Sequence, residues 1–134
     1  MRIGVLAERV GTSTRALRHY ETLGLLSSRR TANGYRDYDE SDVRVVREIR
    51  GLLGIGFALE ETRPFVECLR AGYPSGDACP ASMAVYRRKI AEIDACAASL
   101  AAVRARLTKA LTAELDPDPP VPLCAFTLPT PSTV

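Results

Sequence analysis

The sequence lacks tryptophan, has a single histidine and contains no long hydrophobic run. Its 134 residues include three Phe and five Tyr, a small aromatic supply for a compact core. No apolar stretch approaches the roughly 20 residues that span a bilayer. Glu8 and Arg9 interrupt the first apolar residues, so we expect no signal peptide. These absences predict a cytoplasmic protein with one domain, or with one small domain and an appendage.

Cysteine is scarce and dispersed. Cys68, Cys79, Cys96 and Cys124 form no CxxC pair. In a cytoplasmic chain this spacing favours burial, metal binding or redox activity over a disulfide framework. A catalytic Cys–His pair would need His19, whose neighbours suggest another role. A thiol oxidoreductase is therefore disfavoured, and we do not expect an enzyme.

Positive charge is concentrated in the first part of the chain. The formal net charge is only +2, but residues 1–36 carry seven Arg and two Glu, a net charge of +5. Residues 37–70 carry five Arg and eight acidic residues, a net charge of −3. The basic part is either a surface that faces a polyanion or a solvated arginine-rich face, and charge alone does not decide between them.

Local signals predict a helix-turn-helix followed by a wing. Apolar periodicity over residues 3–10 stops at a glycine, and Thr12-Ser13 provide N-caps for a second helix over residues 14–22. Two short helices joined in this way are typical of a helix-turn-helix. Asn33-Gly34 favours a hairpin turn and residues 35–38 alternate like a strand, so we expect a two-stranded wing.

Three further helices are expected. The acidic residues 39–42 begin a third helix that ends at residues 54–56. A fourth covers residues 59–71, where Pro64 should kink or delay it. The fifth, over residues 82–115, is the longest.

The long helix has a narrow apolar seam. Tyr86, Ile93, Leu100 and Leu107 recur every seven residues. At this length the helix spans about 50 Å, more than a domain of this size covers. Because the chain has no second long helix, the seam predicts homodimerisation. The tail, residues 116–134, holds six of the nine prolines and is expected to be an extended strap.

The joint pattern is more specific than any single element. Its motifs are Ile3-Gly4-Val5-Leu6-Ala7, Thr14-Arg15-Ala16-Leu17-Arg18-His19-Tyr20-Glu21, Gly24-Leu25-Leu26, Asn33-Gly34-Tyr35-Arg36-Asp37-Tyr38 and Leu53-Gly54-Ile55-Gly56-Phe57. In order and spacing they resemble the DNA-binding domain of the MerR family of bacterial transcription regulators. The resemblance covers about residues 1–115.

The resemblance implies a mainly α fold. Residues 1–71 would form a winged helix-turn-helix DNA-binding domain, residues 72–81 a linker loop, and residues 82–115 a dimerisation helix in an antiparallel coiled coil. The implied function is a homodimeric, sequence-specific regulator that remodels promoter DNA, with RNA polymerase as a further partner and no membrane. The alternative is an effector-independent architectural DNA-binding protein with an excisionase-like winged helix, which the long dimer helix disfavours.

The same resemblance implies the DNA contacts. On the second helix they are Thr14, Arg15, Arg18, His19 and Tyr20, and on the wing Tyr35, Arg36 and Tyr38. Arg15 and Arg18 lie three residues apart on one helix face, where arginine reads guanine edges or clamps phosphate. For the two wing tyrosines the alternative is packing at the base of the wing. Leu17 is expected in the core.

Cys79 and Cys124 form the candidate effector site. Pro80 favours the first helical position, which makes Cys79 the N-cap of the long helix, where a thiolate is stabilised. The position resembles that of a metal-ligand cysteine in metal-sensing members of the family. Antiparallel pairing would bring Cys79 of one subunit near Cys124 of the other.

Three effectors are open for this site. Two thiolates suit Cu(I) or a disulfide, but the family's metal loops carry two close cysteines and this tail has only Cys124. A thiophilic metal ion, a thiol redox signal and no effector at all are therefore all retained. Cys68 and Cys96 are expected to be buried packing residues.

Overall fold

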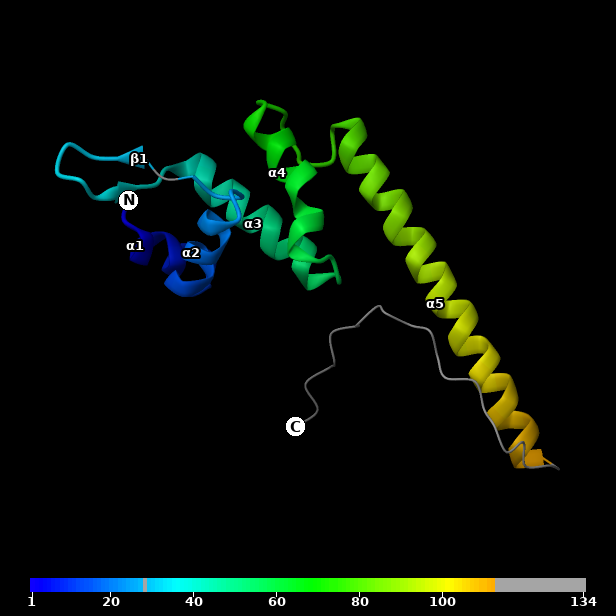
Figure 1. Ribbon diagram of the computed structural model, residues 1–134. Helices are drawn as coiled ribbons and strands as arrows, with labels where there is room; N and C mark the ends of the chain where they lie inside the picture. Colours follow the sequence, from blue (N-terminus) through cyan, green and yellow to red (C-terminus); the bar gives the residue numbers. More distant parts are fainter. Residues whose placement is uncertain (28, 113–134) are drawn as a thin grey trace. The chain divides into compact units, whose positions relative to one another are not determined.

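The computed structural model describes residues 1–27 and 29–112, and the chain divides into two units, residues 1–83 and the part from residue 84 onward. In chain order the elements are α1 (Ile3–Val10), α2 (Thr14–Thr22), β1 (Arg29–Arg30), β2 (Arg36–Asp37), α3 (Glu40–Gly54), the 3-10 helix η1 (Leu59–Thr62), α4 (Arg63–Arg70) and α5 (Pro80–Thr112) (Figure 1). Only the first turn of α5 belongs to the first unit. None of the described helices combines the length and apolar character that a membrane crossing needs.

The first two helices confirm the predicted helix-turn-helix. Gly11 ends α1 with φ 71°, a left-handed conformation that glycine adopts without strain. Ser13 caps α2, because its Oγ accepts a hydrogen bond of 3.1 Å from the Ala16 amide. Leu6 of α1 and Leu17 of α2 are both fully buried in one core, so the two helices are packed against a common centre.

The wing is present but shorter than predicted. β1 and β2 are antiparallel and two residues each, with Arg30 opposite Arg36. Gly34 takes φ 80° in the connecting turn. Beyond β2, the Tyr38 amide donates to the Met1 carbonyl at 2.8 Å, which fastens the base of the wing beside the beginning of α1.

The middle of the unit follows from capping and from one proline. Asp39 caps α3 by accepting from the Ser41 amide at 3.0 Å, and the Asp42 carboxylate accepts from the Asp39 amide at 2.9 Å. The predicted fourth helix is divided into η1 and α4. Pro64 lies in the first turn of α4, where its missing N–H leaves no helical acceptor unsatisfied, so it delays the α-helix as expected.

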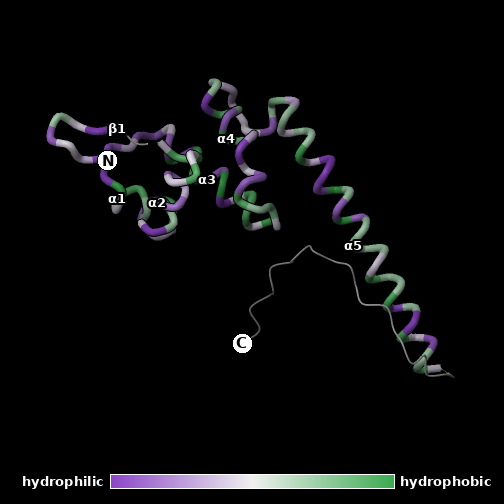
Figure 2. The backbone as a smooth tube through the Cα atoms, viewed as in Figure 1, coloured by the Kyte–Doolittle hydropathy of each residue, from purple (hydrophilic) through white to green (hydrophobic). Residues whose placement is uncertain are grey.

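α5 begins two residues before the predicted boundary. The Cys79 carbonyl accepts from the Ser82 and Met83 amides at 3.1 and 3.3 Å, which places Cys79 at the N-cap, as expected. Along the helix, Ile93, Leu100 and Leu107 are 40, 50 and 60% exposed in the single chain. Figure 2 shows apolar residues recurring along α5. The predicted tail lies outside the described residues.

Candidate nucleic-acid interface

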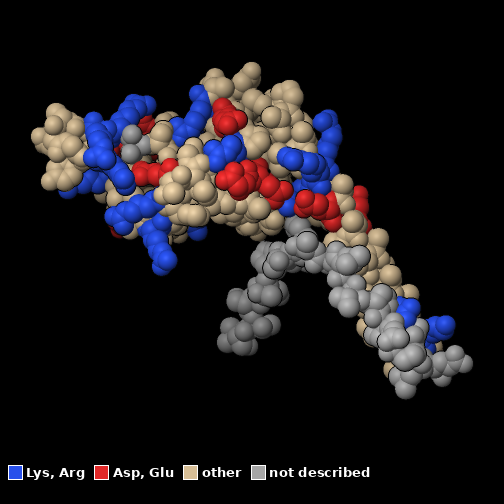
Figure 3. All heavy atoms as spheres, in the orientation of Figure 1, with Lys and Arg blue, Asp and Glu red and all other residues tan. Residues whose placement is uncertain are grey.

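A basic groove lies between α2 and the wing. Two hollows of about 630 and 360 Å³ share Arg18 of α2 and Arg36 of β2 in their lining. Arg2 and Arg30 add two further guanidinium groups to the smaller one. Figure 3 shows arginine side chains gathered around this end of the first unit. We call this surface the Arg18–Arg36 groove, and its charge suits a phosphate backbone.

Two arginines of α2 are exposed and uncommitted. Among the described residues, the guanidinium groups of Arg15 and Arg18 make no hydrogen bond or ion pair. Other arginines hold the fold together: Arg50 donates to the Val10 carbonyl, and Arg63 donates to the Leu23 carbonyl at 2.5 Å. The structure therefore separates two structural arginines from two that are available to a ligand.

Tyr38 is a packing residue at the base of the wing, which is the alternative that the sequence left open for it. Its side chain is only 2% exposed, and its hydroxyl donates to Glu21 Oε1. Glu21 Oε2 lies 3.0 Å from Arg36 Nη1. This one carboxylate therefore joins α2 to two residues of the wing region, Arg36 and Tyr38. The role of Glu21 was not predicted from the sequence. No local pattern indicates it, because its partners are 15 and 17 residues away in the chain.

The ring of Tyr20 also packs in the core, and the contact of its hydroxyl with phosphate stays a prediction. Tyr20 is 6% exposed and lies in the main hydrophobic cluster. Burial raises the pKa of its phenol, and the nearby Arg50 charge acts in the opposite direction. The ring and Leu17 are the two buried side chains of α2 and belong to the same cluster. Of the remaining predicted contacts on α2, His19 is exposed and Thr14 half-buried.

Tyr35 keeps an exposed position at the wing and acquires a partner. It is 54% exposed, and the Arg2 guanidinium carbon lies 4.2 Å from the centre of its ring. This is the geometry of a cation–π contact. Arg2 lies outside the motifs and was not predicted from the sequence, where the basic character of residues 1–36 is the one signal for it.

We expect the Tyr38→Phe substitution to destabilise the first unit by about 1–3 kcal/mol, because it leaves the half-buried Glu21 carboxylate without its hydroxyl donor. The ring packing is retained, so the loss reports the hydrogen bond. Urea unfolding followed by circular dichroism measures it. Tyr35→Phe is the matched control and should change the free energy of unfolding by less than about 0.5 kcal/mol, since the ring is exposed. Equal stability of both variants would contradict the role of Glu21.

The cysteines are arranged differently from the sequence-based expectation. Cys79 is bonded to Cys68 of α4 in a disulfide, with the two Cα atoms 5.9 Å apart. Cys68 is thus more than a packing residue. Cys124 lies outside the described residues, so the predicted pairing with it stays a prediction.

The disulfide also bears on a thiophilic metal ion. A metal ligand must be a thiolate, and the Cys79 sulfur is bonded to another sulfur. Within residues 1–27 and 29–112 no three His, Cys, Asp or Glu side chains are grouped as metal ligands. While this disulfide is formed, Cys79 offers no ligand to a metal ion, and the effector site at Cys79 and Cys124 stays a prediction.

Two family models match most of the described chain. One, described as the MerR HTH family regulatory protein, matches residues 1–67. The other, described as MerR, DNA binding, matches residues 43–110.

Relatives agree with both models. The HTH-type transcriptional regulator HmrR of Rhizobium leguminosarum bv. viciae is 38% identical over 95 residues, 70% of each chain. The nodulation protein NolA of Bradyrhizobium elkanii is 49% identical over 67 residues, which are 49% of this chain and only 31% of that protein. The solved structure of HiNmlR, a MerR family regulator lacking the sensor domain and bound to promoter DNA, has a similar fold. Its TM-score is 0.52 and its identity 24%, over 85% of this chain and 92% of that one.

Proposed function

Since the chain belongs to the MerR family of DNA-binding transcription regulators, we propose that it acts as a homodimer on promoter DNA. In this proposal α2 contacts the bases and the wing contacts the phosphate backbone. The observation that carries this proposal is the Arg18–Arg36 groove, together with the uncommitted guanidinium groups of Arg15 and Arg18 on α2. In this function the chain works in the cytoplasm, where promoters and RNA polymerase are found.

The division of labour follows from exposure and reach. Arg15 and Arg18 project from one face of α2, which is narrow enough to enter the major groove, where arginine pairs with guanine O6 and N7. Arg36 is held by Glu21 at 3.0 Å, so its guanidinium is positioned at the wing to contact phosphate. Tyr35 and Arg2 extend the same backbone contact. His19 and Thr14 add hydrogen-bonding groups on α2.

Dimerisation is supported by the apolar side chains of α5. Ile90, Ile93, Leu100 and Leu107 are each at least 40% exposed in the single chain. A second α5 in antiparallel orientation would remove this surface from water and contribute the hydrophobic free energy of dimer formation. Two linked DNA-binding units then bind two half-sites.

Promoter remodelling is the proposed output. A dimer whose two α2 helices enter successive major grooves would bend and untwist the DNA between them so that RNA polymerase engages the promoter. The deformation costs free energy, which backbone contacts from both wings would offset. Transcription in vitro from a bound promoter, with the helical phase of the DNA followed by circularisation, tests this step. An unchanged DNA twist on binding would leave the simpler architectural role.

Arg18→Ala tests the DNA contact. We expect the substitution to weaken binding to a duplex selected from a random library by about 1–3 kcal/mol, or roughly 5- to 150-fold in the dissociation constant. Fluorescence anisotropy at fixed salt measures it. Arg47→Ala removes the same charge from an exposed position on α3 and is the control. If both variants bind the selected duplex equally, α2 does not carry the recognition.

A further inference from the structure

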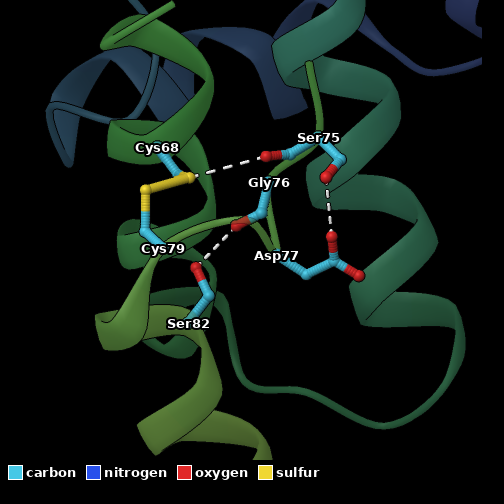
Figure 4. The surroundings of a disulfide bond; sticks show 6 residues. All are labelled: Cys68, Ser75, Gly76, Asp77, Cys79 and Ser82. Carbon is cyan, nitrogen blue, oxygen red and sulfur yellow. Dashed lines mark hydrogen bonds between the residues drawn. A yellow bond between two sulfur atoms is a disulfide. The ribbon is translucent and has the colours of Figure 1, made fainter. Parts of the chain in front are cut away.

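The Cys68–Cys79 disulfide joins α4 to the beginning of α5 (Figure 4). Cys68 is 2% exposed, whereas Cys79 is partly exposed. Cys79 is thus the more accessible residue of the pair, and Cys68 is shielded. A disulfide with this asymmetry has one sulfur that a small thiol attacks and one that leaves into the protein.

The intervening segment is held in place by contacts that do not involve sulfur. Arg44 Nη2 donates to the Pro74 carbonyl at 3.0 Å, and Ser82 Oγ donates to the Gly76 carbonyl at 2.5 Å. Gly76 lies so close to α3 that a Cβ atom there would be 2.7 Å from Glu48 Oε1. These contacts tie the segment to α3 and to the first turn of α5 independently of the sulfur atoms, so they favour re-formation of the bond after a partial opening.

Each sulfur also has surroundings that suit its reduced form. Cys68 Sγ lies 3.5 Å from the Ser75 carbonyl oxygen, which is within hydrogen-bond distance of a thiol donor. Cys79 is at the N-cap of a 33-residue helix, where the helix dipole stabilises a thiolate. A buried thiol with an acceptor and an accessible thiolate at a helix N-terminus form an attacking and resolving pair.

We propose that Cys68 and Cys79 are a reversible thiol–disulfide site, operated by a low-molecular-weight thiol and its disulfide, that fastens or releases the first turn of α5. In reduction, a thiolate attacks Cys79 Sγ, the S–S bond breaks, and Cys68 leaves as a thiolate that takes a proton from water. A second thiol molecule then attacks the sulfur of the first small thiol in the mixed disulfide. This step releases Cys79 as a thiolate and the small molecule as its disulfide. Two electrons pass from two thiols to the protein disulfide, and the reverse sequence oxidises the protein.

The regulatory consequence rests on the proposed function. α4 belongs to the DNA-binding unit and α5 is the proposed dimer helix, so the bond sets how firmly the dimer helix begins on that unit. Closing the 10-residue segment between the cysteines with a covalent bond restricts its open conformations. The connection between α4 and α5 is therefore stiffer in the oxidised dimer than in the reduced dimer.

The full chain allows each cysteine to be followed separately. Trypsin cleaves after Arg50, Arg70 and Arg87 but not between Arg63 and Pro64, so Cys68 and Cys79 fall in peptides 51–70 and 71–87. The protein is equilibrated with defined ratios of reduced and oxidised glutathione, from both directions, then acid-quenched, alkylated and digested. We expect the linked pair of peptides to convert to two alkylated peptides, with the same midpoint from either direction.

Hydrogen exchange measures, without any DNA, how the disulfide holds the first turn of α5. Reduction should speed amide exchange in residues 73–83 by about tenfold or more and leave α1 to α3 unchanged. The Cys68→Ser/Cys79→Ser double variant should match the reduced protein under every glutathione ratio. A pair that is reduced only when the chain unfolds, or equal exchange in both states, would overturn the proposal.

Binding to the selected duplex separates this proposal from the function on which it rests. Reduced and oxidised protein should differ in affinity by about fivefold or more, in the range of ordinary allosteric couplings. Equal affinities would overturn the regulatory role of the disulfide. A chain that binds no duplex in either state would instead refute the proposed function. The exchange and alkylation results would still decide whether the disulfide is reversible and holds the first turn of α5.

Discussion

Replacing Leu100 by Glu is expected to convert the dimer into a monomer. The side chain is 50% exposed in the single chain and lies on the heptad seam with Ile93 and Leu107. Each dimer carries the change twice, and each lost leucine removes about 1.5–3 kcal/mol of hydrophobic free energy. Each glutamate would also have to lose part of its hydration. The dimer dissociation constant should therefore rise at least about 100-fold.

Sedimentation velocity across a concentration series measures this effect. Ala102→Glu is the matched control, because residue 102 is exposed and lies about 200° around the helix from residue 100. It introduces the same charge on the opposite face and should leave the dimer intact. A Leu100→Glu variant that sediments as the native dimer would exclude this seam as the interface.

The same variant should also lose affinity for DNA. Two DNA-binding units joined in a dimer bind their half-sites with a high effective concentration, and a monomer does not. Anisotropy with the selected duplex should show a larger loss for Leu100→Glu than for Arg18→Ala, although no DNA-contacting group has changed. Retained affinity in a proven monomer would mean that one unit suffices for binding.

Leu17→Ala is expected to destabilise the DNA-binding unit by about 2–5 kcal/mol. Leu17 of α2 is fully buried in the main hydrophobic cluster. Its truncation leaves a cavity that neighbouring side chains fill only in part, so the loss exceeds the transfer free energy alone. For a small domain this is a large share of the total stability, and α2 would lose its fixed position.

Urea unfolding gives the free energy directly. Val5→Ala on α1 is the control, because Val5 is 48% exposed and its truncation should cost less than about 0.5 kcal/mol. A Leu17→Ala protein with an unchanged unfolding midpoint would mean that α2 is not anchored through this residue. DNA affinity of the variant, measured below its unfolding transition, should fall as α2 loosens.

Local sequence signals were sufficient for the elements. Helix ends at Gly11, Ser13 and Asp39 were predictable because a cap is a contact between residues two to four apart in the chain. The delay at Pro64 followed from the chemistry of proline. The motif order was sufficient for the family, because it combines several such signals at fixed spacing.

The role of an individual side chain is harder to predict from the sequence. Tyr20 and Tyr38 carry hydroxyl groups in a DNA-binding motif, and the rings of both are buried. A tyrosine suits a phosphate contact and a core position equally well by composition, so its role depends on what surrounds it. Arg36 kept its predicted exposure, but its anchoring by Glu21 was not foreseen.

Periodicity and capping act over a few neighbouring residues, so the helices, the turn of the wing, the seam of α5 and the family could be predicted from the sequence. Three features depend on the folded chain: which arginines are structural, the link from Glu21 to the wing, and the bond between Cys79 and Cys68. These are contacts between residues 11 to 40 positions apart in the chain. Such partners are chosen by packing in three dimensions, where many residues compete for each position, and no local pattern specifies the outcome.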